Sequence, residues 1–292
     1  MIIIGVGLLV ALAIYQGIRY WISAFRNVNM VLDRYKSNDS WALVTGSSDG
    51  IGLGFVRVLA GAGFNVILCG RNSAKLEGVL EGLPKTSKYK IIISDASDIS
   101  DGNFDHVIRE CDGLDLSLVV NNVGVNHGPR RLDQLHPDKV KEIITINCTY
   151  PTLLTRSLIP MLLEHQGPKA IINVSSLAAL LPSPKYSVYS ASKAFNRSLS
   201  LSMSSDYAPG IDVMVCEPGL VATAMTRMKS SLICCSPDEC ASWTLRRLGT
   251  AEEVIPHWKH VLLWGPSQIF VFLIPIAMRS YLYNLLAPKN FK

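Results

Sequence analysis

The spacing most suggestive of chemistry in this chain joins a tyrosine to a lysine. Of the ten tyrosines, only Tyr189 has a lysine four residues later, Lys193. On a helix, residues four positions apart share one face, so these side chains would lie together. The lysine ammonium would then stabilise a tyrosinate and lower the phenol pKa, and a tyrosine tuned in this way can protonate a carbonyl oxygen. The spacing alone also occurs by chance, so the neighbouring segments must decide.

Polar residues follow several predicted strands in the same part of the chain. Each has a plain alternative reading as turn chemistry, helix capping or a buried polar group. Because ligands of open α/β sheets bind at the carboxyl ends of the strands, their common position favours one shared site. A serine there could hydrogen-bond a substrate carbonyl. The segments are Ser175-Ser176, Asn121-Asn122-Val123-Gly124, Asn147 and Glu217-Pro218-Gly219-Leu220-Val221-Ala222-Thr223.

A glycine-rich segment follows the first predicted strand and opens a helix. It reads Thr45-Gly46-Ser47-Ser48-Asp49-Gly50-Ile51-Gly52. Glycine permits a tight turn and a close approach of the backbone to a pyrophosphate. The helix N-terminus adds free N–H groups and a favourable dipole. Such a cluster is often only a turn, but between a first strand and a helix it indicates a dinucleotide site.

The end of the second predicted strand indicates which dinucleotide is bound. NAD-binding folds usually place an acid there for the ribose 2′-hydroxyl, whereas an arginine suits the 2′-phosphate. The chain reads Cys69-Gly70-Arg71-Asn72 and has no acid. Arg71 offers paired donors for a phosphate, so the sequence favours NADPH/NADP+. The alternative is a solvated surface arginine.

The elements that must position these residues alternate along the chain. Short runs rich in Val, Ile and Leu, separated by helical patterns, indicate a parallel sheet covered on both faces. Right-handed connections make this a doubly wound α/β sheet, the Rossmann fold. The predicted strands are 41–45, 65–69, 89–94, 116–120, 169–174 and 211–216, and the predicted helices are 50–62, 72–82, 100–112, 137–165, 187–207 and 237–248.

Both ends of the chain are strongly apolar. Residues 2–18 carry no charge, and a helix over 1–26 is long enough to cross a bilayer. The alternative is a cleaved signal peptide, which the missing basic start and the continuing apolar run disfavour. Basic residues follow the run, so the main domain is expected on the cytosolic side. They are Arg19, Arg26, Arg34 and Lys36.

We therefore predict four parts of the chain. They are a membrane anchor at 1–26, a polar and irregular linker at 27–40, a catalytic domain at 41–260 and an apolar tail at 261–292. Pro266, Pro275 and Arg279 interrupt the tail, which is either a second, broken transmembrane helix or an amphipathic segment facing the membrane or the substrate.

Charge and cysteine usage exclude some classes of protein. The net charge of +5 is too small to imply a nucleic-acid partner. Seven cysteines without a CxxC pair are typical of reduced thiols in a reducing compartment, and no metal site is expected. The adjacent Cys234 and Cys235 are expected to be an exposed pair, with acylation as the alternative.

The region from about Trp41 to Trp264 resembles the short-chain dehydrogenases/reductases in its TGxxxGxG, NNxG, Ser–Tyr-x3-Lys and PG motifs. The resemblance implies a ketoreductase with a nicotinamide cofactor. The catalytic residues that it implies are Ser176, Tyr189, Lys193 and Asn147. The cofactor contacts that it and the residues above imply are Gly46, Ser48, Asp49, Gly50, Ile51, Gly52, Arg71, Asp95, Asn122, Gly124, Tyr189, Lys193, Pro218, Gly219, Val221 and Thr223.

A narrower resemblance is to the very-long-chain 3-oxoacyl-CoA reductases and the 17-beta-hydroxysteroid dehydrogenases of types 3 and 12. It rests on Asp49 within TGSSDGIG, on NNVG, on PSPKYSVYSASKAF at 182–195 and on SPDE at 236–239. It implies an enzyme of the endoplasmic reticulum membrane that faces the cytosol and reduces 3-oxoacyl-CoA in fatty-acid elongation. The chain ends in KNFK, which departs from a dilysine retrieval signal.

Two other functions stay open. One is a 17-ketosteroid reductase, which differs in having a substrate without CoA. The other is a non-catalytic Rossmann protein that binds lipid or acts as a scaffold, against which the intact Ser176, Tyr189 and Lys193 argue. The loop at 224–229 is expected to meet a lipid-like ketone, with Arg227 and Lys229 for CoA phosphates, or to be an ordinary solvated loop. A second copy or elongation-complex proteins are the expected partners.

Overall fold

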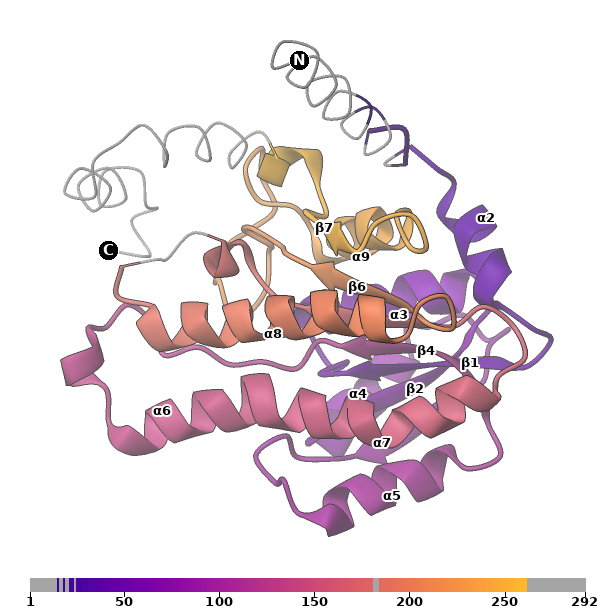
Figure 1. Cartoon of the computed structure of the whole chain (residues 1–292), viewed down its shortest axis with the longest axis horizontal. Helices are drawn as coiled ribbons and strands as arrows, with labels where there is room; N and C mark the ends of the chain where they lie inside the picture. Colours follow the sequence, from indigo (N-terminus) through magenta and orange to yellow (C-terminus); the bar gives the residue numbers. More distant parts are fainter. Residues whose placement is uncertain (1–14, 16–17, 19–20, 24, 181–183, 262–292) are drawn as a thin grey trace, which may run out of the picture.

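The computed structural model describes residues 15, 18, 21–23, 25–180 and 184–261. Its centre is a seven-stranded sheet in the order β3-β2-β1-β4-β5-β6-β7, in which neighbouring strands are parallel (Figure 1). The strands are β1 Ser40–Thr45, β2 Asn65–Gly70, β3 Tyr89–Ile93, β4 Asp115–Asn121, β5 Ala170–Val174, β6 Asp212–Cys216 and β7 Glu253–Val254. The predicted doubly wound α/β sheet is confirmed.

The central strands are buried along their whole length, which explains their continuous apolar sequence. Every residue of β1 and of β5 is buried. A strand covered on both faces has no solvent side on which polar residues would alternate. All six predicted strands are present. The seventh, β7, was not predicted, because two residues are too few to show a period.

Helices cover both faces of the sheet and divide the core in two. Leu43 of β1 packs in one core with Leu158, and its neighbour Val44 packs in the other with Phe55. In Figure 1, α5 to α8 lie on the near side of the sheet, and α3 and α4 lie on the far side. The helices are α3 Gly50–Gly61, α4 Ser73–Leu80, α5 Asp101–Cys111, α6 Pro137–Ile144, α7 Tyr150–Glu164, α8 Ser187–Asp206 and α9 Pro237–Leu245.

The helix predicted at 137–165 is interrupted at a residue of the candidate site. A π-helical turn, Thr145–Thr149, separates α6 from α7, and Asn147 lies at its centre. Pro151 explains the wide turn, because proline has no N–H to donate to the carbonyl four residues earlier, which is that of Asn147. The backbone instead closes from the Tyr150 N–H to the Thr145 carbonyl. Such π-turns are frequently found at functional sites.

The predicted irregular linker at 27–40 is wrong for most of its length. Residues Val28–Leu32 form helix α2, and Asp33–Tyr35 form a 3-10 turn. Val31, Leu32 and Tyr35 are at most 1% exposed. Their helical spacing puts them on one face, which packs into the core behind β1. The Tyr35 hydroxyl also donates to the Asp212 carboxylate, so this segment belongs to the catalytic domain.

The expectation of an exposed cysteine pair is also wrong. Cys234 and Cys235 are both 0% exposed, because backbone hydrogen bonds hold the Cys235 segment against Leu220 and Ala222. All seven cysteines are free thiols, as expected.

The predicted anchor at 1–26 and tail at 261–292 fall almost wholly outside the described residues. Among the residues that are described, no helix is both long and apolar enough to cross a bilayer.

Candidate active site

Helix α8 carries the tyrosine–lysine pair in its first two turns. The Lys193 Nζ lies 5.9 Å from the centroid of the Tyr189 ring, so the predicted i, i+4 neighbours do meet. Lys193 is 4% exposed, and its Nζ donates to the Val174 carbonyl at the end of β5 at 2.9 Å. The Ser175 hydroxyl donates to the Lys193 carbonyl at 2.7 Å and ties the helix to the same strand end.

The electrostatics of the pair differ from the sequence expectation. Burial raises the pKa of Tyr189, and the hydrogen-bonding Ser176 side chain lowers it in part. Burial also lowers the pKa of Lys193 to about 8. The predicted lowering of the phenol pKa by lysine is not the dominant effect here, because the ammonium is turned toward a backbone carbonyl. A phenol with a raised pKa holds its proton at neutral pH, as a proton donor must.

Asn147 links the loop at Val125 to helix α8 next to this pair. Its Oδ1 accepts from the Val125 N–H at 2.8 Å, and its Nδ2 donates to the Val125 carbonyl and to the Ser192 hydroxyl, each at 2.9 Å. A Cβ added to Gly124 would lie 3.2 Å from the Lys193 Nζ and 3.4 Å from the Asn147 Oδ1. The close approach of these two side chains therefore favours glycine at this position of the NNVG motif.

The glycine-rich turn has the geometry expected of a phosphate cradle. Gly46 and Gly50 have φ of 63° and 56°, a region that side chains disfavour. A Cβ on Gly52 would lie 2.3 Å from the Gly46 carbonyl oxygen. Asp49 caps α3 by accepting from the Gly50 N–H at 2.6 Å, and Ser48 and Ile51 flank this cap. The glycines thus let the backbone come close to a pyrophosphate at the helix N-terminus, where the Asp49 carboxylate occupies the Gly50 N–H.

Three further expected contacts lie along the same sheet edge. Arg71 directly follows β2 and is exposed, and Asp95 follows the neighbouring β3. One Asp95 carboxylate oxygen accepts from both the N–H and the hydroxyl of Ser97 at 2.9 Å. Asn122 closes the edge by donating to the Thr45 carbonyl at 2.9 Å. These residues can hold the adenosine half of a dinucleotide, and they do not touch the catalytic pair.

The segment after β6 forms the wall of the site opposite the glycine-rich turn. A Cβ on Gly50 would lie 3.1 Å from the Thr223 Cγ2, so the two segments are in near contact. The Leu177 N–H donates to the Pro218 carbonyl at 3.0 Å, and Val221 is 2% exposed. We call Pro218–Thr223 the strap. It spans from Ser176 and its 3-10 turn to the start of α3.

His260 supports the strap and was not found from the sequence. It is 1% exposed, its Nδ1 accepts from the Gly219 N–H at 3.3 Å, and its Nε2 lies 2.9 Å from the Leu220 carbonyl oxygen. A Cβ on Gly219 would lie 2.9 Å from the His260 ring, which explains the glycine. No local motif marks this histidine, because the contact joins positions about 40 residues apart.

The pairing of the buried Glu217 with the half-buried Glu253, beside the strap, was also not found from the sequence. Glu217 is 0% exposed, and its Oε1 lies 3.4 Å from the Arg197 Nε. Arg197 makes its shorter bonds to Glu253, at 3.0 and 2.8 Å. Burial and the adjacent Glu253 carboxylate raise the pKa of Glu217 to about 9. One arginine therefore serves two carboxyl groups, of which Glu217 keeps its proton at neutral pH.

The contribution of Glu217 to the stability of the folded chain should become less favourable as the pH rises from about 4.5 to about 9. In this window the unfolded chain has lost the Glu217 proton and the folded chain has kept it. Glu217→Gln should remove this slope and raise the free energy of unfolding at pH 7 by roughly 1–3 kcal/mol. Urea unfolding of both proteins between these pH values measures it. Glu252→Gln, on an exposed neighbouring glutamate, should behave as the unchanged chain does; an equal slope in the Glu217 variant would contradict the assignment.

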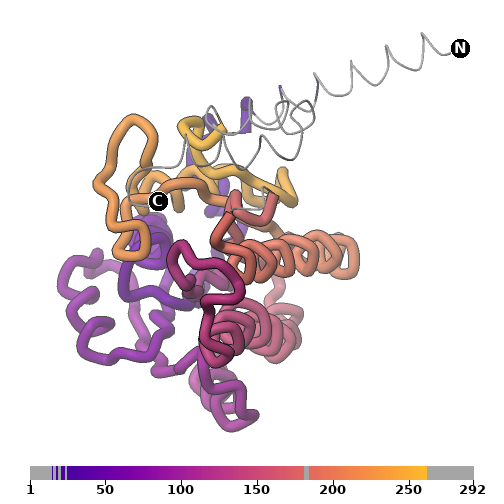
Figure 2. Tube along the Cα trace, turned by 90° about the vertical axis from the view of Figure 1, so that its left-hand side faces the viewer, coloured from indigo at the N-terminus to yellow at the C-terminus, as the bar shows by residue number. Residues whose placement is uncertain are grey.

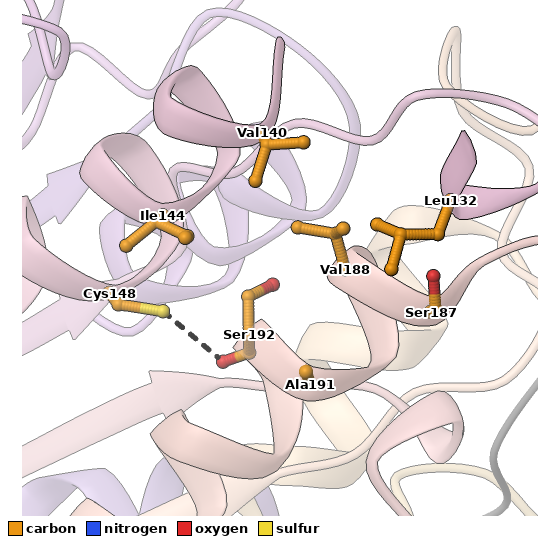
Figure 3. A pocket seen from close by; sticks show the side chains of 8 residues that line it. All are labelled: Leu132, Val140, Ile144, Cys148, Ser187, Val188, Ala191 and Ser192. Carbon is orange, nitrogen blue, oxygen red and sulfur yellow. Dashed lines mark hydrogen bonds between the residues drawn. The ribbon is translucent and has the colours of Figure 1, made fainter. Parts of the chain in front are cut away.

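An apolar pocket of about 420 Å³ lies beside the site and not in it. Figure 3 shows side chains of α6, of the π-helical turn and of α8 around it. Cys148 and Ser192 line it, and they flank Asn147 and Lys193 in the sequence. Tyr189, Lys193 and Ser176 are not among its lining residues. The residues around it are Leu132, Val140, Ile144, Cys148, Ser187, Val188, Ala191 and Ser192.

Comparison with known proteins agrees with this geometry. Residues 40–232 match the family model described as short chain dehydrogenase. A very-long-chain 3-oxoacyl-CoA reductase of Phaeosphaeria nodorum is 31% identical over 92% of this chain and 83% of that protein. A very-long-chain 3-oxoacyl-CoA reductase-like protein of Arabidopsis thaliana is 38% identical over 79% of this chain and 77% of its own length.

Among solved structures, a 3-ketoacyl-(acyl-carrier-protein) reductase from Brucella melitensis complexed with NADH superposes with a TM-score of 0.67 at 22% identity. The match covers 75% of this chain and 96% of that one. This likeness concerns the fold. Together with the matched family model and the relatives, the cluster of Ser176, Tyr189 and Lys193 leads to one conclusion: the chain is an oxidoreductase that belongs to the short-chain dehydrogenase family.

Proposed function

We propose that this protein reduces the ketone of a lipid-like substrate with NADPH, and that the substrate is a 3-oxoacyl-CoA. The observation that carries the proposal is the protonated Tyr189 beside Ser176 and the buried Lys193 at the carboxyl end of β5. A bound nicotinamide would supply the hydride. The glycine turn, the strap and the edge at Arg71 fit the three parts of a dinucleotide. Each of them offers backbone or cationic donors at the carboxyl end of the sheet.

The protein's own residues carry out the proton chemistry. The Ser176 hydroxyl hydrogen-bonds the substrate oxygen and fixes the carbonyl beside Tyr189. As the carbonyl gains charge, the Tyr189 hydroxyl releases its proton to that oxygen. Lys193 is placed to stabilise the tyrosinate that remains, since the two share one face of α8. Asn147 keeps the loop at Val125 and the start of α8 in register.

The substrate class follows from the relatives and from the loop after the strap. The two relatives described above are named as very-long-chain 3-oxoacyl-CoA reductases or as similar to them. In this chain the exposed Arg227 and Lys229 can meet phosphates of a CoA headgroup, and the 48% exposed Met225 offers an apolar contact. An acyl-CoA would use both chemistries, whereas a ketosteroid would use only the apolar one.

A direct comparison of substrates tests the proposal. The purified full-length chain is mixed with NADPH and either a long-chain 3-oxoacyl-CoA or a 17-ketosteroid, and NADPH oxidation is followed. We expect a higher kcat/KM for the acyl-CoA. A higher value for the steroid would favour the ketosteroid reductase. No oxidation with either would favour the non-catalytic lipid-binding protein.

We also propose that the chain is anchored in the endoplasmic reticulum membrane with its catalytic domain in the cytosol. Support comes from the uncharged run at 2–18 and the basic residues that follow it. Protease added to sealed microsomes should therefore cleave the domain without detergent, while a lumenal marker protein stays intact. Protection of the domain until detergent is added would reverse the topology.

A further inference from the structure

Residues 224–235 form a loop that we call the finger. The tip of the finger is a tight turn of unusual composition. The Ser231 N–H donates to the Cys234 carbonyl at 2.8 Å, and the Cys234 N–H donates back at 3.4 Å. Leu232 and Ile233 are the two residues of the turn itself. Turn positions usually carry polar residues or glycine, and because neither Leu232 nor Ile233 has a positive φ, this turn accepts any L side chain. The geometry of the turn therefore does not explain a Leu-Ile pair at its tip.

The apolar side chains at the tip are also unusually exposed to solvent. Leu232 is 84% exposed, more than any other large hydrophobic side chain in the described ranges, and Ile233 is 43% exposed. Met225, on the same finger, is 48% exposed. Single exposed apolar residues are ordinary, but three on one projecting loop mark an interaction surface.

The charge around the tip indicates which kind of partner it can bind. No acidic residue occurs between Pro218 and Pro237, whereas Arg227 and Lys229 are exposed on the finger. Apolar side chains flanked by cations match the boundary between acyl chains and phosphate headgroups of a bilayer. A soluble protein partner that buried the apolar tip would also have to supply an acidic group for each of the two cations.

The finger is held rigidly at its base. The Ala222 N–H donates to the Cys235 carbonyl at 2.9 Å, and the Cys235 N–H donates to the Leu220 carbonyl at 3.2 Å. The Thr226 hydroxyl donates to the Val221 carbonyl at 2.6 Å. All these bonds end on the strap. The base of the finger is therefore hydrogen-bonded to a wall of the active site.

The finger stands out from the body of the molecule. Figure 2 shows this orange loop projecting on the left. In both views it lies on the upper side, as do the described indigo residues 21–23 and 25–26 at the end of the predicted anchor (Figures 1 and 2). Both segments carry exposed apolar side chains, since Ile22 is 65% and Phe25 is 72% exposed.

We propose that Leu232 and Ile233 insert into the lipid bilayer, so that the finger is a second membrane contact that sets the mouth of the site at the bilayer surface. Arg227 and Lys229 then lie at the level of the lipid phosphates. The inference goes beyond the proposed function, because it concerns how the domain sits on the membrane and does not depend on which ketone is reduced.

A fluorescent label next to the tip tests the insertion directly. All seven natural cysteines are buried, so a cysteine introduced by Ser231→Cys reacts selectively and leaves Leu232 and Ile233 in place. The labelled full-length chain is reconstituted in vesicles of phosphatidylcholine and phosphatidylserine containing brominated lipid. Insertion should quench a large part of the emission, because it carries the label into the boundary between headgroups and acyl chains. The same label at Asp105→Cys, on α5 at the bottom of Figure 1, should be quenched little.

Changing the tip alone should abolish the quenching. Leu232→Ser with Ile233→Ser should bring the signal at position 231 down to that at position 105, while the thermal unfolding midpoint stays the same. Leu232→Phe should retain the quenching, because it keeps an apolar tip. Equal quenching at both labels in the unchanged tip, or its persistence in the double serine variant, would overturn the proposal.

One further outcome would assign the tip to another role. If bilayer quenching is absent and the label becomes shielded from iodide only when NADPH and a ketone are added, the tip closes over bound substrate, and membrane insertion is rejected. The vesicle measurement uses no ketone, so a chain that failed as a 3-oxoacyl-CoA reductase could still pass it.

Discussion

Tyr189→Phe should lower kcat by about 10²–10⁴, the range that general acid catalysis contributes. The variant keeps the ring that packs 5.9 Å from the Lys193 ammonium and removes only the hydroxyl that is placed to donate the proton. Because that proton moves only as the transition state forms, NADPH affinity should be almost unchanged. Stopped-flow single turnover with a long-chain 3-oxoacyl-CoA, together with NADPH fluorescence titration, measures the two quantities separately.

Tyr207→Phe is the matched control for this experiment. It removes the same hydroxyl from a tyrosine at the far end of the same helix, after Asp206, and should leave kcat as it is. A Tyr189 variant with near-native turnover would remove the residue from the role of proton donor. A large loss of NADPH affinity would instead give the hydroxyl a structural part in the cofactor site.

Arg71→Ala should weaken NADPH binding by roughly 1.5–3 kcal/mol, the scale of a charged hydrogen bond, which is about 10- to 150-fold in Kd. NADH binding should hardly change. Arg71 is exposed after β2, and the strand end carries no acid that would prefer a ribose hydroxyl. Only the 2′-phosphate distinguishes the two cofactors, so the loss should be selective. Titration of both cofactors by protein fluorescence measures it.

Lys75→Ala provides the control for charge in general. Lys75 is an exposed cation in the first turn of α4, close in sequence to Arg71 but inside the helix. It should leave the ratio of NADPH to NADH affinity almost unchanged. Equal losses for both cofactors in the Arg71 variant would exclude the 2′-phosphate site. Equal losses in both variants would point to long-range attraction of an anionic ligand.

The parts of the molecule that are local in sequence could be predicted well. The order of strands and helices follows from apolar runs and their spacing, because each buried strand between two helical layers must be apolar throughout. The tyrosine–lysine pair met on α8 because the i, i+4 relation is a property of any helix. Even the interruption at Asn147 has a local cause in Pro151, although the predicted helix ran across it.

What the sequence could not determine depends on contacts between distant segments. Tyr35 bonds to Asp212, and this contact turns an expected linker into part of the core. His260 supports Gly219, and Glu253 raises the pKa of Glu217, yet neither His260 nor Glu253 stands in a motif. Periodicity reports which face of one element is apolar, and it carries no information about which other element will cover that face.

The protonation of the active site was likewise decided by tertiary structure. From sequence, the proximity of Lys193 to Tyr189 suggested a lowered phenol pKa, since an adjacent cation favours the tyrosinate. In the folded chain both groups are taken out of water, which penalises both charged forms and shifts each group toward neutrality. The sequence thus determined which residues form the pair and that they share a helix face, whereas burial beneath β5, the strap and Asn147 decided their charge.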